Sequence, residues 1–167
     1  MANNTLYYST AKSDADRAMY QMDLTQGNPK VLIAVDKYDL FPMFVTGNIL
    51  VVEAKPGFDF YGVEYWGVDT QSGQRLWKYS IKSTARFTYY TARPTSQAAF
   101  VLSCRDTAGC AWAVLDPQTG AASSPGSISN GEPVDITRGK DDTLYLVEHF
   151  TLYVINTLNG QTLYTWP

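Results

Sequence analysis

One turn signature recurs four times along the 167-residue chain and restricts its fold more than any other feature. In each copy an Asp or Asn is followed four residues later by a Gly, and an apolar residue comes directly before the Asp or Asn. Successive glycines are 46, 47 and 40 residues apart, a period typical of arrays built from one supersecondary unit. The four pairs are Asp23 and Gly27, Asp69 and Gly73, Asp116 and Gly120, and Asn156 and Gly160.

The chemistry of this signature is that of a β-hairpin turn. A short Asp side chain accepts hydrogen bonds from backbone N–H groups two or three residues further on, which starts the turn. The Gly supplies the positive φ with which a hairpin loop of this length ends. Ser72 and Thr119, each directly before the Gly, can add hydroxyl hydrogen bonds. Each copy therefore predicts a hairpin that joins two strands.

Strand-like runs precede these turns with the same period. Runs rich in Val, Leu and Tyr occupy residues 5–10, 48–54, 98–104 and 143–150, and a further run opens each of the last three units at 40–47, 86–92 and 133–139. Each unit thus predicts a four-stranded meander, with the opening strand missing from the first. We expect fifteen strands and no helix, with residues 11–19 forming a loop. Four antiparallel strands per unit of ~40–45 residues is the signature of a β-propeller blade.

The predicted fold is therefore all-β, a β-propeller of four blade-like repeats in one domain over 1–167. The repeats cover about 5–35, 40–81, 86–128 and 133–167. Disorder is excluded because 45% of the residues are hydrophobic and 14% are aromatic. Since propellers have about 4–8 blades, three interpretations stay open. The chain is a segment of a larger propeller, a half-ring that self-associates through its open blade faces, or a small ring of four blades.

The copy from Gly67 to Trp77 resembles the tryptophan-docking repeat of the PQQ-like (quinoprotein) β-propellers. Gly67 takes the small position, Asp69 the Asp, Ser72 the Thr, Gly73 the Gly and Trp77 the Trp. The resemblance implies that Trp77 packs between neighbouring blades, and a buried indole N–H needs a hydrogen-bond acceptor. In the other copies the Trp position is held by Val31, Ser124 and Tyr164.

The two cysteines predict a disulfide. Cys104 ends one predicted strand and Cys110 begins the next, so they can face each other across a hairpin within disulfide distance. Two reduced thiols are the alternative. A disulfide would indicate a periplasmic or extracellular protein, although the start of the chain lacks the pattern of a signal peptide. Quinoprotein dehydrogenases use adjacent cysteines against the quinone, and this chain has none adjacent. We therefore expect no cofactor.

Residues suited to catalysis or metal binding are sparse. The single histidine, His149, would have to serve any Ser-His-Asp triad, and no G-x-S-x-G turn surrounds a serine. One His and two Cys have no metal-ligand spacing. The carboxylate pairs Asp14 with Asp16 and Asp141 with Asp142 lack the continuation of a calcium loop and are expected to be solvated turn residues. We expect no enzyme, no catalytic residues and no metal.

The segment 54–66 is the exception among the loops, because it carries Phe58, Phe60 and Tyr61. Aromatic residues on a loop favour protein binding; the alternative is that they cover the edge of a blade. With a net charge of −3 and no basic run, nucleic acid is an unsuitable partner. No apolar run is long enough to insert into a membrane.

The predicted function is a non-catalytic binding or scaffold module that presents loops to a protein partner. The alternatives are a degenerate quinoprotein-like enzyme and the ligand- or sugar-sensing propeller domain of a larger receptor.

Overall fold

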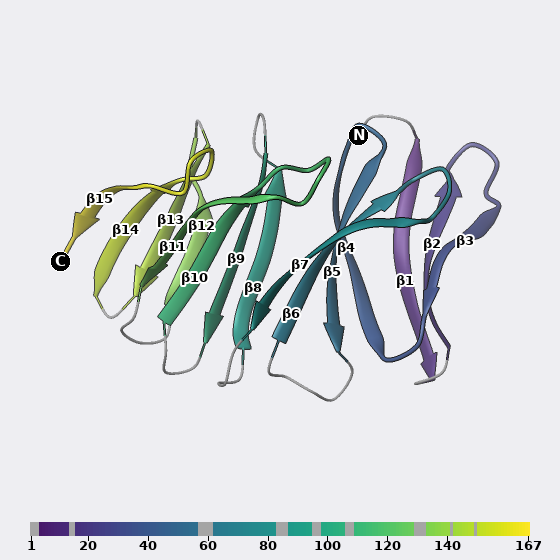
Figure 1. Ribbon diagram of the computed structural model, residues 1–167, viewed down its shortest axis with the longest axis horizontal. Coiled ribbons are helices and arrows are strands. Elements are labelled where there is room, and N and C mark those ends of the chain that lie inside the picture. Colours follow the sequence, from purple (N-terminus) through teal and green to yellow (C-terminus); the bar gives the residue numbers. More distant parts are fainter. Residues whose placement is uncertain are drawn as a thin grey trace.

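The computed structural model describes residues 4–13, 16–56, 62–82, 87–94, 98–105, 109–128, 133–140, 142–148 and 150–167. In this part of the chain there are fifteen strands in four antiparallel sheets and no helix (Figure 1). The sheets stand side by side like blades of a fan, with the first and last sheets at opposite ends (Figure 1). We call them blades 1 to 4 in chain order.

Each blade is a meander in which consecutive strands pair. Blade 1 has three strands, β1 (Thr5–Ser13), β2 (Asp16–Asp23) and β3 (Pro29–Val35). Blade 2 has β4 (Tyr38–Thr46), β5 (Ile49–Pro56), β6 (Gly62–Asp69) and β7 (Arg75–Lys82). Blade 3 has β8 (Phe87–Pro94), β9 (Ala99–Arg105), β10 (Gly109–Leu115) and β11 (Ala122–Ile128). Blade 4 has β12 (Pro133–Arg138), β13 (Thr143–Glu148), β14 (Thr151–Asn156) and β15 (Thr162–Trp166).

The prediction of a loop over residues 11–19 is wrong. Strand β1 continues to Ser13 and β2 begins at Asp16, so most of this segment is paired. The β1–β2 ladder runs through Ala11 opposite Arg17 and ends with Ser13 opposite Asp16. The polar residues Ser13 and Asp16 therefore lie at the end of the β1–β2 ladder.

Among the described residues, the hydrophobic core forms three clusters between the blades. Alternate residues of one strand enter different clusters, because successive side chains of a strand point to opposite faces. In β5, Leu50, Val52 and Ala54 pack toward blade 1, whereas Val51 packs toward blade 3. A strand buried on both faces needs apolar residues at successive positions, which explains the continuous run of apolar residues in β5.

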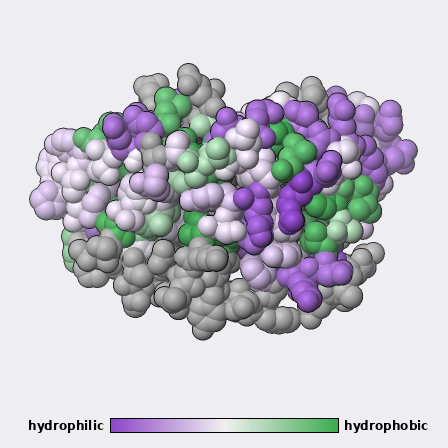
Figure 2. Space-filling model, in the orientation of Figure 1, coloured by the Kyte–Doolittle hydropathy of each residue, from purple (hydrophilic) through white to green (hydrophobic). Residues whose placement is uncertain are grey.

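On the face drawn in Figure 2, polar residues are unevenly distributed over the blades. Figure 2 shows the most hydrophilic residues over the half of the molecule that holds blades 1 and 2, and paler residues at the blade 4 end. Within the described ranges, no helix has the length and apolar character needed to cross a membrane.

Candidate protein-interaction site

The four repeat turns share one set of hydrogen bonds. The backbone N–H groups of Gly27, Gly73, Gly120 and Gly160 donate to the carbonyl oxygen of the Asp or Asn four residues earlier, at 2.8, 2.9, 2.7 and 2.8 Å. Their φ angles are 70°, 72°, 69° and 69°. The predicted positive φ is thus confirmed at all four glycines. The side-chain oxygens of Asp23, Asp69, Asp116 and Asn156 accept N–H groups from inside their own turns.

The turn carboxylates are held in their ionised form. For Asp69, hydrogen bonds from the Ser72 backbone N–H and hydroxyl lower the pKa below its ordinary value. The Thr119 backbone N–H lowers the pKa of Asp116, and the Thr25 hydroxyl lowers that of Asp23. A carboxylate stabilised in this way is a poor proton acceptor. These side chains therefore serve the turns.

Trp77 connects blade 2 to blade 3, as its position in the repeat implies. Its ring is 7% exposed on the outer strand β7, and its Nε1–H donates to the carbonyl oxygen of Pro117 at 2.8 Å. The ring lies against Gly67 of its own blade and Gly120 in the turn of the next. A Cβ at Gly120 would come within 2.6 Å of the ring, and a Cβ at Gly67 would overlap it. Both glycines make room for the indole.

A second tryptophan, which the sequence analysis missed, connects blade 3 to blade 4. Trp112 is 4% exposed and lies on β10 directly opposite Gly126 of β11. Its Nε1–H donates to the carbonyl oxygen of Gly160 at 2.8 Å. In blade 2 the Gly is on the third strand and the Trp on the fourth, whereas in blade 3 the Trp is on the third strand and the Gly on the fourth. A search for a Trp four residues after the turn Gly therefore misses Trp112. The cross-strand register would have been the necessary signal.

In blade 1, Leu32, one residue beyond the Trp position, is among the residues that contact the next blade. A bulge in the β2–β3 ladder leaves Leu32 unpaired, and Val31, at the Trp position, is 53% exposed. Leu32 enters the core cluster with blade 2, and its backbone carbonyl lies where a Cβ of Gly73 would be. The side chain of Ser124, the third residue at the Trp position, lies outside the described part of the structure.

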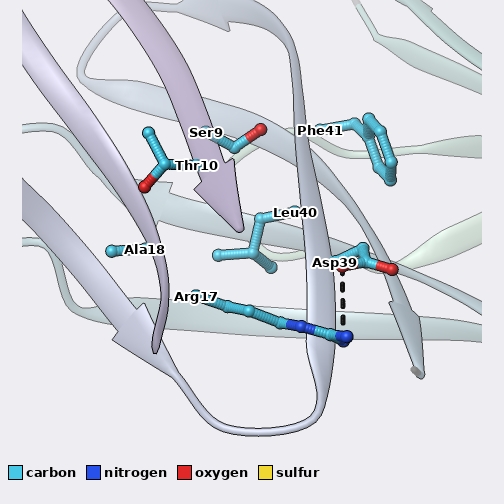
Figure 3. A pocket seen from close by; sticks show the side chains of 7 residues that line it. All are labelled: Ser9, Thr10, Arg17, Ala18, Asp39, Leu40 and Phe41. Atoms are coloured by element: carbon cyan, nitrogen blue, oxygen red, sulfur yellow. Dashed lines mark ion pairs between the residues drawn. The ribbon is translucent and has the colours of Figure 1, made fainter. Parts of the chain in front are cut away.

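A cavity of about 190 Å³ lies between β1 and β4, the innermost described strands of blades 1 and 2 (Figure 3). It is lined by Ser9 and Thr10 of β1, Arg17 and Ala18 of β2, and residues 39–41 of β4. Figure 3 shows the Arg17 side chain reaching across to Asp39, and their charged groups are 3.3 Å apart. The Arg17 side chain is 9% exposed, whereas that of Asp39 is 38% exposed, so the guanidinium is buried and the carboxylate reaches solvent.

A buried carboxylate stands on the strand next to this cavity. Glu53 lies opposite Phe41 in the β4–β5 ladder, its side chain is 3% exposed, and its Oε1 is 3.3 Å from Lys55 Nζ. Burial raises the pKa of Glu53 to about 7, although the charge of Lys55 acts in the opposite direction. Glu53 therefore titrates near neutral pH.

We expect Glu53 to make the stability of the protein depend on pH. Below its ordinary pKa of 4.5 the side chain is protonated in both the folded and the unfolded state. As pH rises from there to about 7, the unfolded state ionises first and folding loses stability, by about 3 kcal/mol in total. Glu53→Gln removes this loss. Urea titrations give the free energy of unfolding of the variant and of the natural chain at each pH. The variant's value minus the natural chain's value should increase by about 2–3 kcal/mol from pH 5 to pH 8. An equal difference at both pH values would contradict the prediction.

The structure contains the disulfide between Cys104 and Cys110. The two residues are directly opposite in the β9–β10 ladder and are buried in the cluster between blades 3 and 4. The disulfide therefore joins two neighbouring strands inside the core and does not form an exposed redox site.

Several predicted residues lie outside the described ranges: Phe58, Phe60, Tyr61, Asp14, Asp141 and His149. Among the residues that are described, no group of three or more His, Cys, Asp or Glu could hold a metal ion.

Comparison with known proteins shows the fold. No protein-family model and no curated protein matches the sequence. The chain is similar in structure to BamB from Moraxella catarrhalis, with a TM-score of 0.62 and 16% identity over 98% of this chain and 49% of that one. It is also similar to a europium-containing methanol dehydrogenase, with a TM-score of 0.64 and 15% identity over 100% and 40%. A chain of the mitotic checkpoint complex gives a TM-score of 0.63 and 14% identity over 98% and 48%.

These neighbours are β-propellers, and the fold is that of a partial β-propeller. The chain spans about half the length of BamB and of the checkpoint-complex chain, and less of the dehydrogenase.

Proposed function

We propose that the chain is a non-catalytic binding or scaffold module that binds an extended segment of a protein partner along β1. The incomplete blade 1 carries this proposal. Leu6 pairs with Met22 as Leu50 pairs with Val68, so β1 takes the place of β5. Strand β5 has a neighbour on each side, whereas no strand in the described ranges pairs with the inner edge of β1.

The composition of β1 suits the addition of a strand. From Thr5 to Ala11 it has neither a charged residue nor a proline, the features with which edge strands avoid pairing. An added strand would satisfy the backbone groups of this edge and could place a side chain in the adjoining cavity. The Arg17–Asp39 pair, in which only Arg17 is buried, would offer that side chain polar contacts.

The comparisons support an interaction role without assigning a partner. One structural neighbour comes from a multiprotein assembly, the mitotic checkpoint complex. The residues Phe58, Phe60 and Tyr61 are a second proposed contact of the same module. The Cys104–Cys110 disulfide supports a periplasmic or extracellular setting.

The test is a selection from phage-displayed random peptides, followed by affinity measurements on two extended variants. In the first variant a copy of residues 38–46, the β4 sequence, precedes β1 behind a Gly/Ser linker and fills the open edge. The control carries a Gly/Ser extension of equal length. Selected peptides should bind the filled variant about tenfold or more weakly than the control. Equal binding to both variants, or no selected peptide, would count against the proposal.

Because the fold is similar to that of a methanol dehydrogenase, the alternative of a quinoprotein-like enzyme is tested directly. The protein is incubated with PQQ and Ca²⁺ and examined by absorbance and thermal unfolding. We expect no bound chromophore and no increase in Tm. A bound chromophore with a raised Tm would support a quinoprotein-like enzyme instead.

A further inference from the structure

Two blade faces have no neighbouring blade among the described residues: the face of blade 4 that points away from blade 3, and the face of blade 1 that points away from blade 2 (Figure 1). We call them the front face of blade 4 and the back face of blade 1. In blade 4, Leu144, Leu146 and Ile155 pack toward blade 3. Because side chains alternate along a strand, their neighbours point to the front face. The register places eight residues there: Tyr145, Val147, Leu152, Val154, Tyr164 and Trp166 on β13 to β15, and Asp135 and Thr137 on β12.

Over β13 to β15 the front face of blade 4 is apolar and exposed, whereas the exposed Asp135 and Thr137 lie on the β12 side of it. Tyr145, Tyr164 and Trp166 are 36%, 56% and 61% exposed. No charged residue occurs anywhere from 150 to 167, so the edge strand β15 lacks the charges with which natural edge strands avoid association. Single exposed apolar residues are ordinary, but a contiguous group of them marks an association surface.

Blade 2 shows what the corresponding face of another repeat packs against. Tyr164 lies opposite Val154 and Trp166 opposite Leu152, as Trp77 lies opposite Gly67 and Tyr79 opposite Tyr65 in blade 2. Tyr65 and Trp77 are buried against blade 3. The front face of blade 4 is therefore the counterpart of a surface that elsewhere in this chain is covered by the back of another blade.

The back face of blade 1 corresponds to the face with which blade 2 packs on the blade before it. Leu6, Tyr8, Tyr20 and Met22 hold the positions of four blade 2 residues that pack on blade 1, namely Leu50, Val52, Trp66 and Val68. Leu6 is 43% exposed, and the Tyr8 and Tyr20 rings stack at 5.4 Å.

The turn of blade 1 is open as well. The turns at Gly73 and Gly120 are each contacted by the blade before them, whereas a Cβ at Gly27 would meet no atom within 4 Å. Leu24, which holds the position of the Pro117 acceptor in this turn, is 51% exposed.

We propose that the front face of blade 4 docks on the back face of blade 1 of a second copy, so that two chains close a ring of eight blades. Within one chain the two faces lie at opposite ends of the fan, so neither covers the other (Figure 1). The faces differ from each other, which makes the contact head-to-tail, and two such contacts close the ring. One copy spans 49% of BamB, so two copies supply the length of that single chain. This self-assembly is independent of the proposed strand binding at β1.

The test begins with sedimentation equilibrium and light scattering over a concentration series. The natural chain should reach twice the mass of one 18.6 kDa chain. Trp166→Asp on the front face and Leu6→Asp on the back face should each raise the dissociation constant about tenfold or more. Leu76→Asp, at a residue 47% exposed on β7 and on neither face, should leave it unchanged. Circular dichroism confirms that each variant is folded.

Mixing the two variants separates a head-to-tail contact from any other. At a concentration at which neither Trp166→Asp nor Leu6→Asp dimerises alone, the mixture retains one intact junction and should form a dimer. A single-chain mass for the natural protein at every concentration would overturn the proposal. A dimer that Leu6→Asp leaves intact, or a mixture that stays monomeric, would overturn it too, since both outcomes indicate a contact without the back face of blade 1.

Discussion

Trp77→Ala should lower the free energy of unfolding by about 3–5 kcal/mol, the cost of removing a large aromatic side chain from a core. The ring is buried between Gly67 and Gly120, so its removal leaves a cavity that two backbone segments cannot fill. It also removes the hydrogen bond to the carbonyl oxygen of Pro117, which joins blade 2 to blade 3. Denaturant unfolding of the variant measures the loss.

Two control substitutions show whether the loss belongs to the docking position. Leu76→Ala changes the neighbouring residue on β7, which is 47% exposed, and should cost within about 0.5 kcal/mol. Ser124→Ala changes the same repeat position in blade 3 and should also cost far less than Trp77→Ala. Losses of similar size at Trp77 and Ser124 would mean that the repeat is misaligned.

Gly73→Ala should destabilise the protein by about 2–4 kcal/mol, more than the positive φ alone accounts for. An Ala at φ 72° is strained, and its Cβ would also overlap the backbone carbonyl of Leu32 in blade 1. A backbone atom cannot move aside as the end of a flexible side chain can. The substitution should therefore push blades 1 and 2 apart.

Gly27→Ala is the matched control, because Gly27 has a φ of 70° but no atom within 4 Å of the added Cβ. It should cost only about 1 kcal/mol. Both variants are measured by urea unfolding in the Trp166→Asp background, so that self-association does not contribute. Equal losses at Gly27 and Gly73 would show that the turn conformation alone sets the cost and that the contact with Leu32 is unimportant.

Local chemistry along the chain was sufficient to predict the turns and most of the strands. The bond from the Ser72 N–H to Asp69 and the positive φ of Gly73 depend on residues within one turn, so their spacing in the sequence carries the information. The same holds for Cys104 and Cys110, which lie on two strands joined by one hairpin. The Trp77 contact could be predicted because residues 67–77 match the tryptophan-docking repeat at every position that defines it, with Ser72 in place of the Thr.

The tertiary structure alone decided which residues of different blades meet. The position of a bulge determines that Leu32, and not Val31, faces blade 2, and strand register pairs Trp112 with Gly126. The cavity beside β1 was equally unpredictable, because Arg17 and Asp39 belong to different repeats and meet only when blades 1 and 2 pack. A turn depends on bonds between residues close in the chain, whereas a contact between blades depends on how whole sheets pack, which no short stretch of sequence specifies.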